Sequence, residues 1–279
     1  MTHTELEFQF TQRQSDGSLR RGRTFQETFA TDKPARETWL FVSPHDDDLC
    51  LGAGLLMQAA IAAGVEVQVL VVTDGCLGYC TQEQEAEIVA IRREETYASF
   101  AILGAPAEQI AYVNYPDGGL TAYCGRRRAR PGESHLQGYV GLQNAFTWHL
   151  RRVRPSRVFT PTHTDLHPDH RITHSELMIS IFHAAGAIWP ELGPSLPAPP
   201  RVGELAVYCD FAAPPNLEIQ ANDAAFQQKL RSVEAYRSQT QIAALVENTR
   251  QAGPYEYVRE VEFQLYSPRN YRAMFASPE

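Results

Sequence analysis

The sequence predicts an α/β protein with a Rossmann-like, mainly parallel sheet that helices cover on both faces. Apolar runs of strand length alternate with helical segments of ten or more residues, which is the pattern of repeated βαβ units. The 279 residues are 43% hydrophobic and 21% charged, so the chain can bury a large core. No internal repeat or second domain is evident. We expect a single domain over residues 1–279, divided into an N-terminal arm (1–36), an α/β core (37–240) and a C-terminal edge strand and tail (241–279).

Six short segments have the composition of strands. Each is rich in apolar residues, many of them β-branched or aromatic, and most end at polar or turn-forming residues. In chain order, these expected strands cover residues 39–42, 65–72, 110–115, 157–160, 204–210 and 257–265. The last has apolar residues at alternate positions and is assigned to a late edge strand. The polar segment before the first strand contains a Ser-Asp-Gly turn at residues 15–17 that could join two short strands.

Helical segments connect most of these strands. The first is apolar and Ala-rich and ends at Gly64, and the second has charged and apolar residues at helical spacing before Gly104. The expected helices cover residues 49–63, 85–103, 138–152, a segment after His170, and 223–239. The stretch 189–200 contains five prolines and is expected to be a loop.

Charge and composition exclude several classes of protein. The chain has 25 Lys plus Arg against 33 Asp plus Glu, a net charge of −8, which argues against a broad nucleic-acid-binding surface. One short basic run, 126–130, is the exception. No apolar run approaches the roughly 20 residues that a membrane span needs. The five cysteines lack tight paired spacing, and the first residues lack the pattern of a secretory signal. We expect a cytoplasmic protein with no membrane span and no nucleic-acid partner.

Acidic residues and histidines follow the expected strands, where the binding crevice of a parallel sheet lies. Polar residues stand directly after four strands, at 45–48, 73–75, 117–119 and 163–170. Three consecutive Asp beside a His repel one another unless a cation or protonation relieves the charge. His and Asp together are typical ligands of zinc or another borderline divalent ion, so we predict a metal site.

Structural interpretations of the same residues remain open at this point. The Asp run could instead cap the following helix, because Asp accepts hydrogen bonds from free amide groups at a helix start. His174 lies four residues after His170 but has no accompanying Glu in an H-E-x-x-H pattern, so we interpret it as structural.

These two clusters resemble the motifs of the PIG-L or LmbE-like family of metal-dependent N-acetylglucosaminyl deacetylases. The family pattern H-P-D-D is matched by residues 45–48, and H-P-D-H is matched by residues 167–170. The resemblance extends over roughly residues 39–175, and the Tyr-Arg-Ser-Gln run at 236–239 is also similar. One departure is Asp46 in the usual proline position, which frees a φ angle and adds a charge that could tune metal affinity or contact a cationic substrate.

The resemblance implies a metal centre and a general base. His45, Asp48 and His170 would bind Zn²⁺ or another divalent ion such as Fe²⁺, and Asp47 would be the general base toward a metal-activated water. A bound divalent ion can lower the pKa of water from 15.7 to roughly 7. A general base typically contributes ~10² to 10⁴ in rate.

The resemblance also implies roles for residues around the metal. His167 would stabilise the oxyanion in its protonated form, and Asp169 would orient this histidine. Asp117 would hold sugar hydroxyls, and Arg92 or Arg93 would contact the substrate. For the arginines, a solvated helix face is an equally good interpretation.

We therefore expect a zinc-dependent N-deacetylase, a hydrolase of linear amides that removes the N-acetyl group from an N-acetylglucosamine-type sugar or sugar conjugate. The alternatives are an amidase acting on a non-sugar N-acyl compound and a non-catalytic metal-binding relative. A nucleotide-binding module is disfavoured, because acidic residues stand where a Gly-rich turn would be needed. The sequence leaves the exact substrate, the native metal and the oligomeric state open, a homo-oligomer included.

Overall fold

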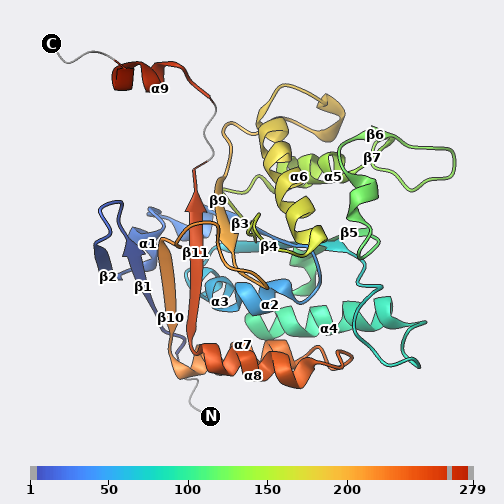
Figure 1. Ribbon diagram of the computed structural model, residues 1–279, viewed down its shortest axis with the longest axis horizontal. Helices are drawn as coiled ribbons and strands as arrows, with labels where there is room; N and C mark the ends of the chain where they lie inside the picture. Colours follow the sequence, from blue (N-terminus) through green and yellow to red (C-terminus); the bar gives the residue numbers. More distant parts are fainter. Residues whose placement is uncertain (1–4, 263–265, 276–279) are drawn as a thin grey trace.

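The computed structural model describes residues 5–262 and 266–275. Within them, a nine-stranded sheet forms the centre of the fold, in the order β2-β1-β10-β11-β9-β8-β3-β4-β5 (Figure 1). Its strands are β1 (Phe8–Arg13), β2 (Leu19–Arg23), β3 (Thr38–Ser43), β4 (Glu66–Thr73), β5 (Ile110–Tyr115), β8 (Arg157–Pro161), β9 (Arg201–Leu205), β10 (Leu217–Ala221) and β11 (Tyr255–Val261). A separate small ribbon pairs β6 (Arg127–Arg128) with β7 (Tyr139–Val140).

The sheet is mixed rather than mainly parallel, which corrects the sequence-based expectation. The five strands from β9 to β5 pair in parallel. The other four, β2, β1, β10 and β11, pair antiparallel to their neighbours. The βαβ pattern of the sequence corresponds to the parallel half, because neighbouring parallel strands need crossover connections, which are usually helical.

The expected N-terminal arm is instead part of the sheet. Strand β1 pairs with β10, and β2 pairs with β1. Phe10, Phe25 and Phe29 are buried, and the rings of Phe25 and Phe29 lie 5.4 and 4.8 Å from that of Trp39. Aromatic contacts of this kind attach the segment firmly to the core.

The expected late edge strand lies inside the sheet. Strand β11 pairs with β10 on one side and β9 on the other, so β2 and β5 are the edges of the described sheet. Residues 263–265 of that expected strand lie outside the described residues. Alternation of apolar residues indicated a strand, but it carries no information about which strands will be neighbours.

Helices cover both faces of the sheet, as expected. Alternate residues of β3 face opposite ways: Trp39 and Phe41 pack against the side with α3 and α7, whereas Leu40 and Val42 pack against α5 and α6. Figure 1 shows these two pairs of helices on opposite sides of the sheet. The helices are α1 (Phe25–Thr28), α2 (Asp48–Gly52), α3 (Gly54–Ala62), α4 (Ile88–Leu103), α5 (Leu142–Val153), α6 (Pro168–Ala185), α7 (Asp223–Glu234), α8 (Ile242–Ala252) and α9 (Arg269–Arg272). None of the helices in the described part of the chain has the length and apolar character required to cross a membrane.

Several element boundaries differ from those expected. The helix expected over 49–63 is divided at Ala53, whose backbone (φ −144°, ψ 11°) is not helical. The helix expected from 138 begins at Leu142, because residues 139–140 form β7. The strand expected at 204–210 is β9, which lies several residues earlier, and the last expected helix ends at Glu234. Strand β10 and helix α8 were not expected at all.

A buried arginine organises the proline-rich loop. The loop expected over 189–200 is confirmed, with one short 3₁₀ helix at Pro190–Leu192. The five N–H groups of the Arg151 side chain in α5 lie within hydrogen-bond distance of six main-chain carbonyls at the end of α6 and in this loop. A cation placed at a helix C-terminus is favourable, because the last carbonyls lack amide partners. Arg151 therefore holds the end of α6 and the loop together.

Candidate metal centre and active site

The first acidic cluster turns directly from β3 into α2. The backbone amide of His45 donates to Asp48 Oδ2 at 2.8 Å, and Ser43 Oγ donates to the His45 carbonyl. Asp47 occupies the N-cap position of α2 but makes no capping hydrogen bond with its side chain. Helix capping therefore does not explain the run of Asp residues. The burial of these carboxylates therefore requires an explanation other than helix capping.

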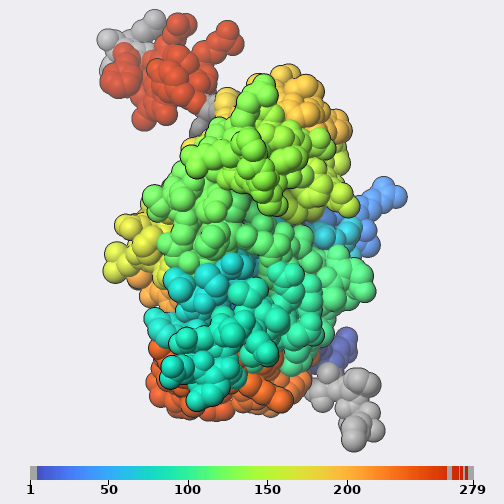
Figure 2. Space-filling model, turned by 90° about the vertical axis from the view of Figure 1, so that its right-hand side faces the viewer, coloured from blue at the N-terminus to red at the C-terminus, as the bar shows by residue number. Residues whose placement is uncertain are grey.

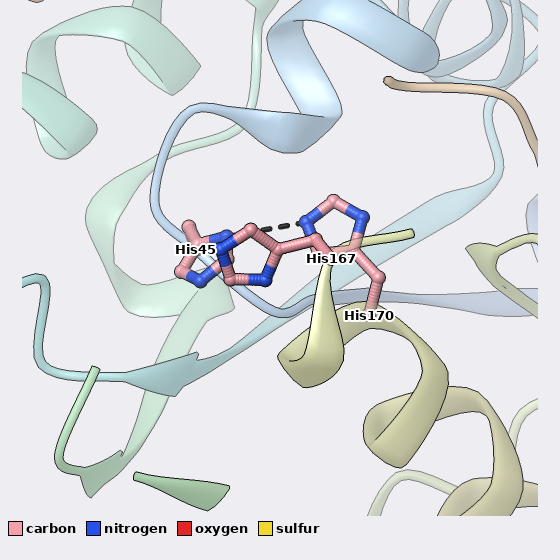
Figure 3. A group of neighbouring side chains, drawn as sticks. All are labelled: His45, His167 and His170. Carbon is pink, nitrogen blue, oxygen red and sulfur yellow. Dashed lines mark hydrogen bonds between the residues drawn. The ribbon is translucent and has the colours of Figure 1, made fainter. Parts of the chain in front are cut away.

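Three donor atoms from two separate segments converge at this point. His45 Nδ1 lies 3.2 Å from His170 Nε2, and Asp48 Oδ2 lies 3.4 Å from the former and 3.2 Å from the latter. Figure 3 shows the rings of His45 and His170 facing each other, with His167 beside them. Tetrahedral ligands at 2.0–2.1 Å from zinc are about 3.3 Å apart, so the spacing fits such an ion.

The burial of Asp48 also fits a cation. Its side chain is fully buried, and Asp48 Oδ1 has no hydrogen-bond partner within the described residues. Burial favours the neutral acid, but the charges of His170 and His45 outweigh it and hold the pKa of Asp48 well below its usual value. The same attraction raises the pKa of His170 to about 9, against the effect of burial. A divalent ion would replace these protons with its own charge.

Carboxylates hold the outer nitrogen of each imidazole. His170 Nδ1 lies 3.1 Å from Asp165 Oδ2, and the Tyr208 ring stacks on His170 with centroids 5.1 Å apart. His45 Nε2 lies 3.2 Å from Asp117 Oδ1 and 3.4 Å from Asp169 Oδ2. Metal-binding histidines commonly donate their second N–H to a carboxylate, which fixes the tautomer and the ring orientation.

Asp169 does not hold His167 as the resemblance implied. Its carboxylate contacts His45 and accepts a hydrogen bond from the backbone amide of Gly118 at 2.8 Å. Gly118 has a φ of 71°, a left-handed conformation that suits glycine and directs this amide inward. His167 Nδ1 instead accepts a hydrogen bond from the backbone amide of Asp169 at 3.3 Å.

His167 is available as a neutral donor. Because its Nδ1 accepts the Asp169 amide, its ring proton is placed on Nε2. Burial, together with the charges of His45 and His170, lowers the pKa of His167. The protonated imidazole expected from the sequence is thus disfavoured, yet the neutral ring keeps one N–H to donate.

Asp47 directly precedes Asp48 and is held by a guanidinium and a side-chain amide. Arg92 Nη2 lies 3.3 Å from Asp47 Oδ2, and Gln239 Nε2 donates to the same oxygen. Burial and the charge of Asp48 raise the pKa of Asp47 above its usual value, although Arg92 opposes the change. A raised carboxylate pKa suits a group that must accept and then return a proton.

Asp46 and Arg92 form a buried ion pair, which the sequence did not indicate. Arg92 Nε lies 2.7 Å from Asp46 Oδ2, and Arg92 Nη2 lies 2.6 Å from Asp46 Oδ1. The arginine is only 4% exposed, and its guanidinium lies over the Tyr236 ring. Asp46 therefore meets an internal cation, and the burial of Arg92 excludes only the interpretation of a solvated helix face. Arg93 points elsewhere and bonds to Asn114.

Several site residues were not identified from the sequence. Asp165 and Tyr208 contact His170, and Gln239 contacts Asp47, although the similarity at 236–239 had drawn attention to that segment. The local signal for Asp165 was its place in the His-rich run. Tyr208 gave no such signal. The expected strand over 204–210 included it, whereas the observed strand β9 ends before it.

The basic run 126–130 is largely paired within the protein. Arg126 stacks on the rings of Tyr139 and Trp189, and Arg127 pairs with Glu133. In Figure 2 this segment lies in the light green lobe at the top of the visible face. Its guanidinium groups thus serve the local loop structure.

The fold and the site define an α/β protein with a candidate two-histidine, one-aspartate metal centre. The family model of PIG-L, GlcNAc-PI de-N-acetylase, matches residues 40–181, about half of the chain. The chain therefore belongs to the PIG-L family. This match contains every residue of the candidate metal centre and confirms the resemblance seen in the sequence.

The sequence identity to individual relatives is low. The chain is 27% identical to diacetylchitobiose deacetylase of Thermococcus kodakarensis over 136 residues, which are 47% of this chain and 44% of that protein, so the match spans less than half of the relative. The structure is similar to N,N'-diacetylchitobiose deacetylase from Pyrococcus horikoshii, with a TM-score of 0.64, 23% identity, and coverage of 86% of this chain and 94% of the other. It is also similar to GalB, the 4-carboxy-2-hydroxymuconate hydratase of Pseudomonas putida KT2440, with a TM-score of 0.60, 17% identity, and coverage of 83% and 98%. The shared fold alone thus does not fix the reaction.

Proposed function

We propose that the protein is a metal-dependent N-deacetylase that removes the N-acetyl group from an N-acetylglucosamine-type sugar or sugar conjugate. The observation that carries this proposal is the convergence of His45 Nδ1, Asp48 Oδ2 and His170 Nε2 beside a buried carboxylate, Asp47. Membership of a de-N-acetylase family and the diacetylchitobiose deacetylase relative support the reaction and the sugar substrate.

In this proposal His45, Asp48 and His170 hold the metal, with Zn²⁺ or Fe²⁺ as the candidates. A divalent ion in such a site lowers the pKa of water toward about 7 and polarises an acyl oxygen. Asp165 fixes the ring of His170, and Asp117 with Asp169 fixes that of His45, so both imidazoles present the correct nitrogen.

Asp47 supplies the proton transfers. A water attacks the acyl carbon while Asp47 accepts its proton; the carbon–nitrogen bond then breaks, and Asp47 returns the proton to the leaving nitrogen. The products are acetate and a free amine. Gln239 and Arg92 both donate to Asp47 Oδ2 and so keep this carboxylate in place. His167 Nε2–H donates to the acyl oxygen as negative charge builds there.

The site also bears on the choice between a sugar deacetylase and an amidase of non-sugar compounds. Asp117 lies at the rim of the site with its side chain 12% exposed, one oxygen facing His45. A second oxygen of the same carboxylate can accept a substrate hydroxyl, which only a hydroxylated substrate offers. Sugar selectivity should therefore depend on Asp117.

The test is release of free amine from N-acetylglucosamine and N,N'-diacetylchitobiose by the zinc-reconstituted protein. Asp47→Asn should lose ~10² to 10⁴ in rate, and His167→Ala should lose ~10² to 10³, both with unchanged metal content. His135→Ala, at an exposed histidine outside the site, is the matched control. Full activity of Asp47→Asn would overturn the proposed base.

A second part of the same experiment distinguishes a sugar deacetylase from an amidase of non-sugar compounds. Asp117→Asn should raise KM for the sugars, whereas hydrolysis of a simple N-acetyl amine should lose only what the weaker support of His45 costs. Activity only on non-sugar amides would instead favour the amidase.

A further inference from the structure

A second group of potential metal ligands lies apart from the candidate metal centre. His163 Nδ1 lies 3.0 Å and His174 Nε2 3.1 Å from the same atom, Glu204 Oε1. These three donor atoms all lie within 4.8 Å of one another. They come from three elements: the loop after β8, the second turn of α6, and β9. None of them is a ligand of the first centre.

Glu204 is fixed in position before any cation arrives. Its other oxygen, Oε2, accepts a hydrogen bond from Arg259 of the adjacent strand β11 at 2.7 Å, in register with Glu204. Its side chain is 2% exposed. Oε1 therefore points permanently toward the two imidazoles, and a neighbour that orients a ligating carboxylate is a usual feature of metal sites.

Solvent reaches this group from one side. Exposure of the side chains rises from 2% for Glu204 to 11% for His174 and 47% for His163. An ion can thus enter past His163, and a water can complete its coordination. Two imidazoles and a carboxylate suit zinc and similar borderline ions rather than Mg²⁺ or Ca²⁺.

We propose that His163, His174 and Glu204 form a second, solvent-accessible site for a borderline divalent cation such as Zn²⁺. Ligands at 2.0–2.2 Å from zinc are spaced about 3.3 Å apart, which the exposed His163 can reach by a small movement of its loop. The bound ion joins the β8–α6 loop, α6 and β9. Helix α6 also carries His170, so the second ion holds the helix that serves the first centre. The inference does not depend on deacetylase activity.

The competing interpretation is a purely hydrogen-bonded His–Glu–His group, in which Glu204 accepts from both rings. The hydrogen bonds of this group need no metal, and it agrees with the sequence-based interpretation of His174 as structural. The two interpretations differ in one measurable quantity, the number of zinc ions bound per chain.

The experiment is equilibrium dialysis of the full-length chain against Zn²⁺, with elemental analysis and a circular dichroism spectrum of each sample. We expect about two zinc equivalents for the wild type and about one for His163→Ala. Asp48→Asn, which impairs the first centre, should keep the second equivalent and lose it when combined with His163→Ala. His135→Ala should bind as the wild type does.

His163→Asp gives a further check, because it exchanges one zinc ligand for another. It should restore part of the second equivalent, whereas a merely structural histidine would not be replaced in this way. One equivalent in the wild type that is kept in His163→Ala, or two equivalents in His163→Ala, would overturn the proposal. Because His163 lies on an exposed loop, loss of binding in a variant with a wild-type spectrum cannot come from unfolding.

Discussion

Removal of Arg92 should strongly destabilise the protein, because it leaves two adjacent buried carboxylates without their cation. Arg92 pairs with Asp46 through two contacts of 2.6 and 2.7 Å and lies 3.3 Å from Asp47. Breaking a buried ion pair by removing one partner costs about 3–5 kcal/mol. The guanidinium also lies 4.9 Å from the Tyr236 ring, a contact of about 1 kcal/mol or more. We expect Arg92→Met to lose about 4 kcal/mol of unfolding free energy.

A double-mutant cycle tests the reason for this loss. Asp46→Asn should relieve part of the cost of Arg92→Met, because one uncompensated charge disappears. The two changes should therefore deviate from additivity by about 1–3 kcal/mol. The assay is urea denaturation of the metal-free protein, followed by tryptophan fluorescence, so that metal affinity does not enter.

Arg93→Met provides the matched control on the same helix. Its guanidinium bonds to Asn114 near the surface and lies over the Tyr112 ring, so we expect a loss of about 1 kcal/mol or less. The reasoning fails if Arg92→Met lowers the free energy of unfolding no more than Arg93→Met does, or if the cycle is additive within about 0.5 kcal/mol. In either case the ion pair does not stabilise the turn from β3 into α2.

Three further predictions concern stability away from the site. Arg151→Met should cost at least about 2 kcal/mol in urea denaturation and speed hydrogen exchange in the proline-rich loop, since six carbonyls lose one charged donor; unchanged exchange would contradict it. Lys229→Met should cost about 3–5 kcal/mol, because it leaves the buried Glu256, 2.6 Å from Lys229 Nζ, without its cation, although the backbone amides of Leu55 and Leu56 still donate to it, and adding Glu256→Gln should recover part of that loss. Burial, and then the charge of Arg152, lower the pKa of His149 to about 4. The contribution of neutral His149 to folding stability is therefore present above the unfolded pKa near 6.5 and is lost as the pH falls toward 4. His149→Gln should reduce the loss of stability between these pH values by roughly 2–3 kcal/mol, and parallel stability profiles of wild type and variant would refute the assignment.

Much of the fold and of the site was predictable from local sequence signals. Strands β3, β4, β5 and β8 lie where apolar runs predicted them, and helices α4 and α6 follow in the expected order. The two histidine-aspartate motifs also indicated which residues converge, because residues after parallel strands meet at one edge of the sheet. His45, Asp48 and His170 are indeed neighbours.

The sequence alone determined most of the segments that form strands and helices, β10 and α8 excepted, and which motifs stand at the strand ends, because periodicity and turn residues act over a few positions. The tertiary structure decided what depends on residues far apart in the chain. It placed β11 inside the sheet and paired Arg92 with Asp46. It also directed the Asp169 carboxylate toward His45 and placed Glu204 beside His163 and His174. Strand neighbours and the partners of buried charges are chosen by packing and desolvation in three dimensions, and these leave little trace in a local pattern.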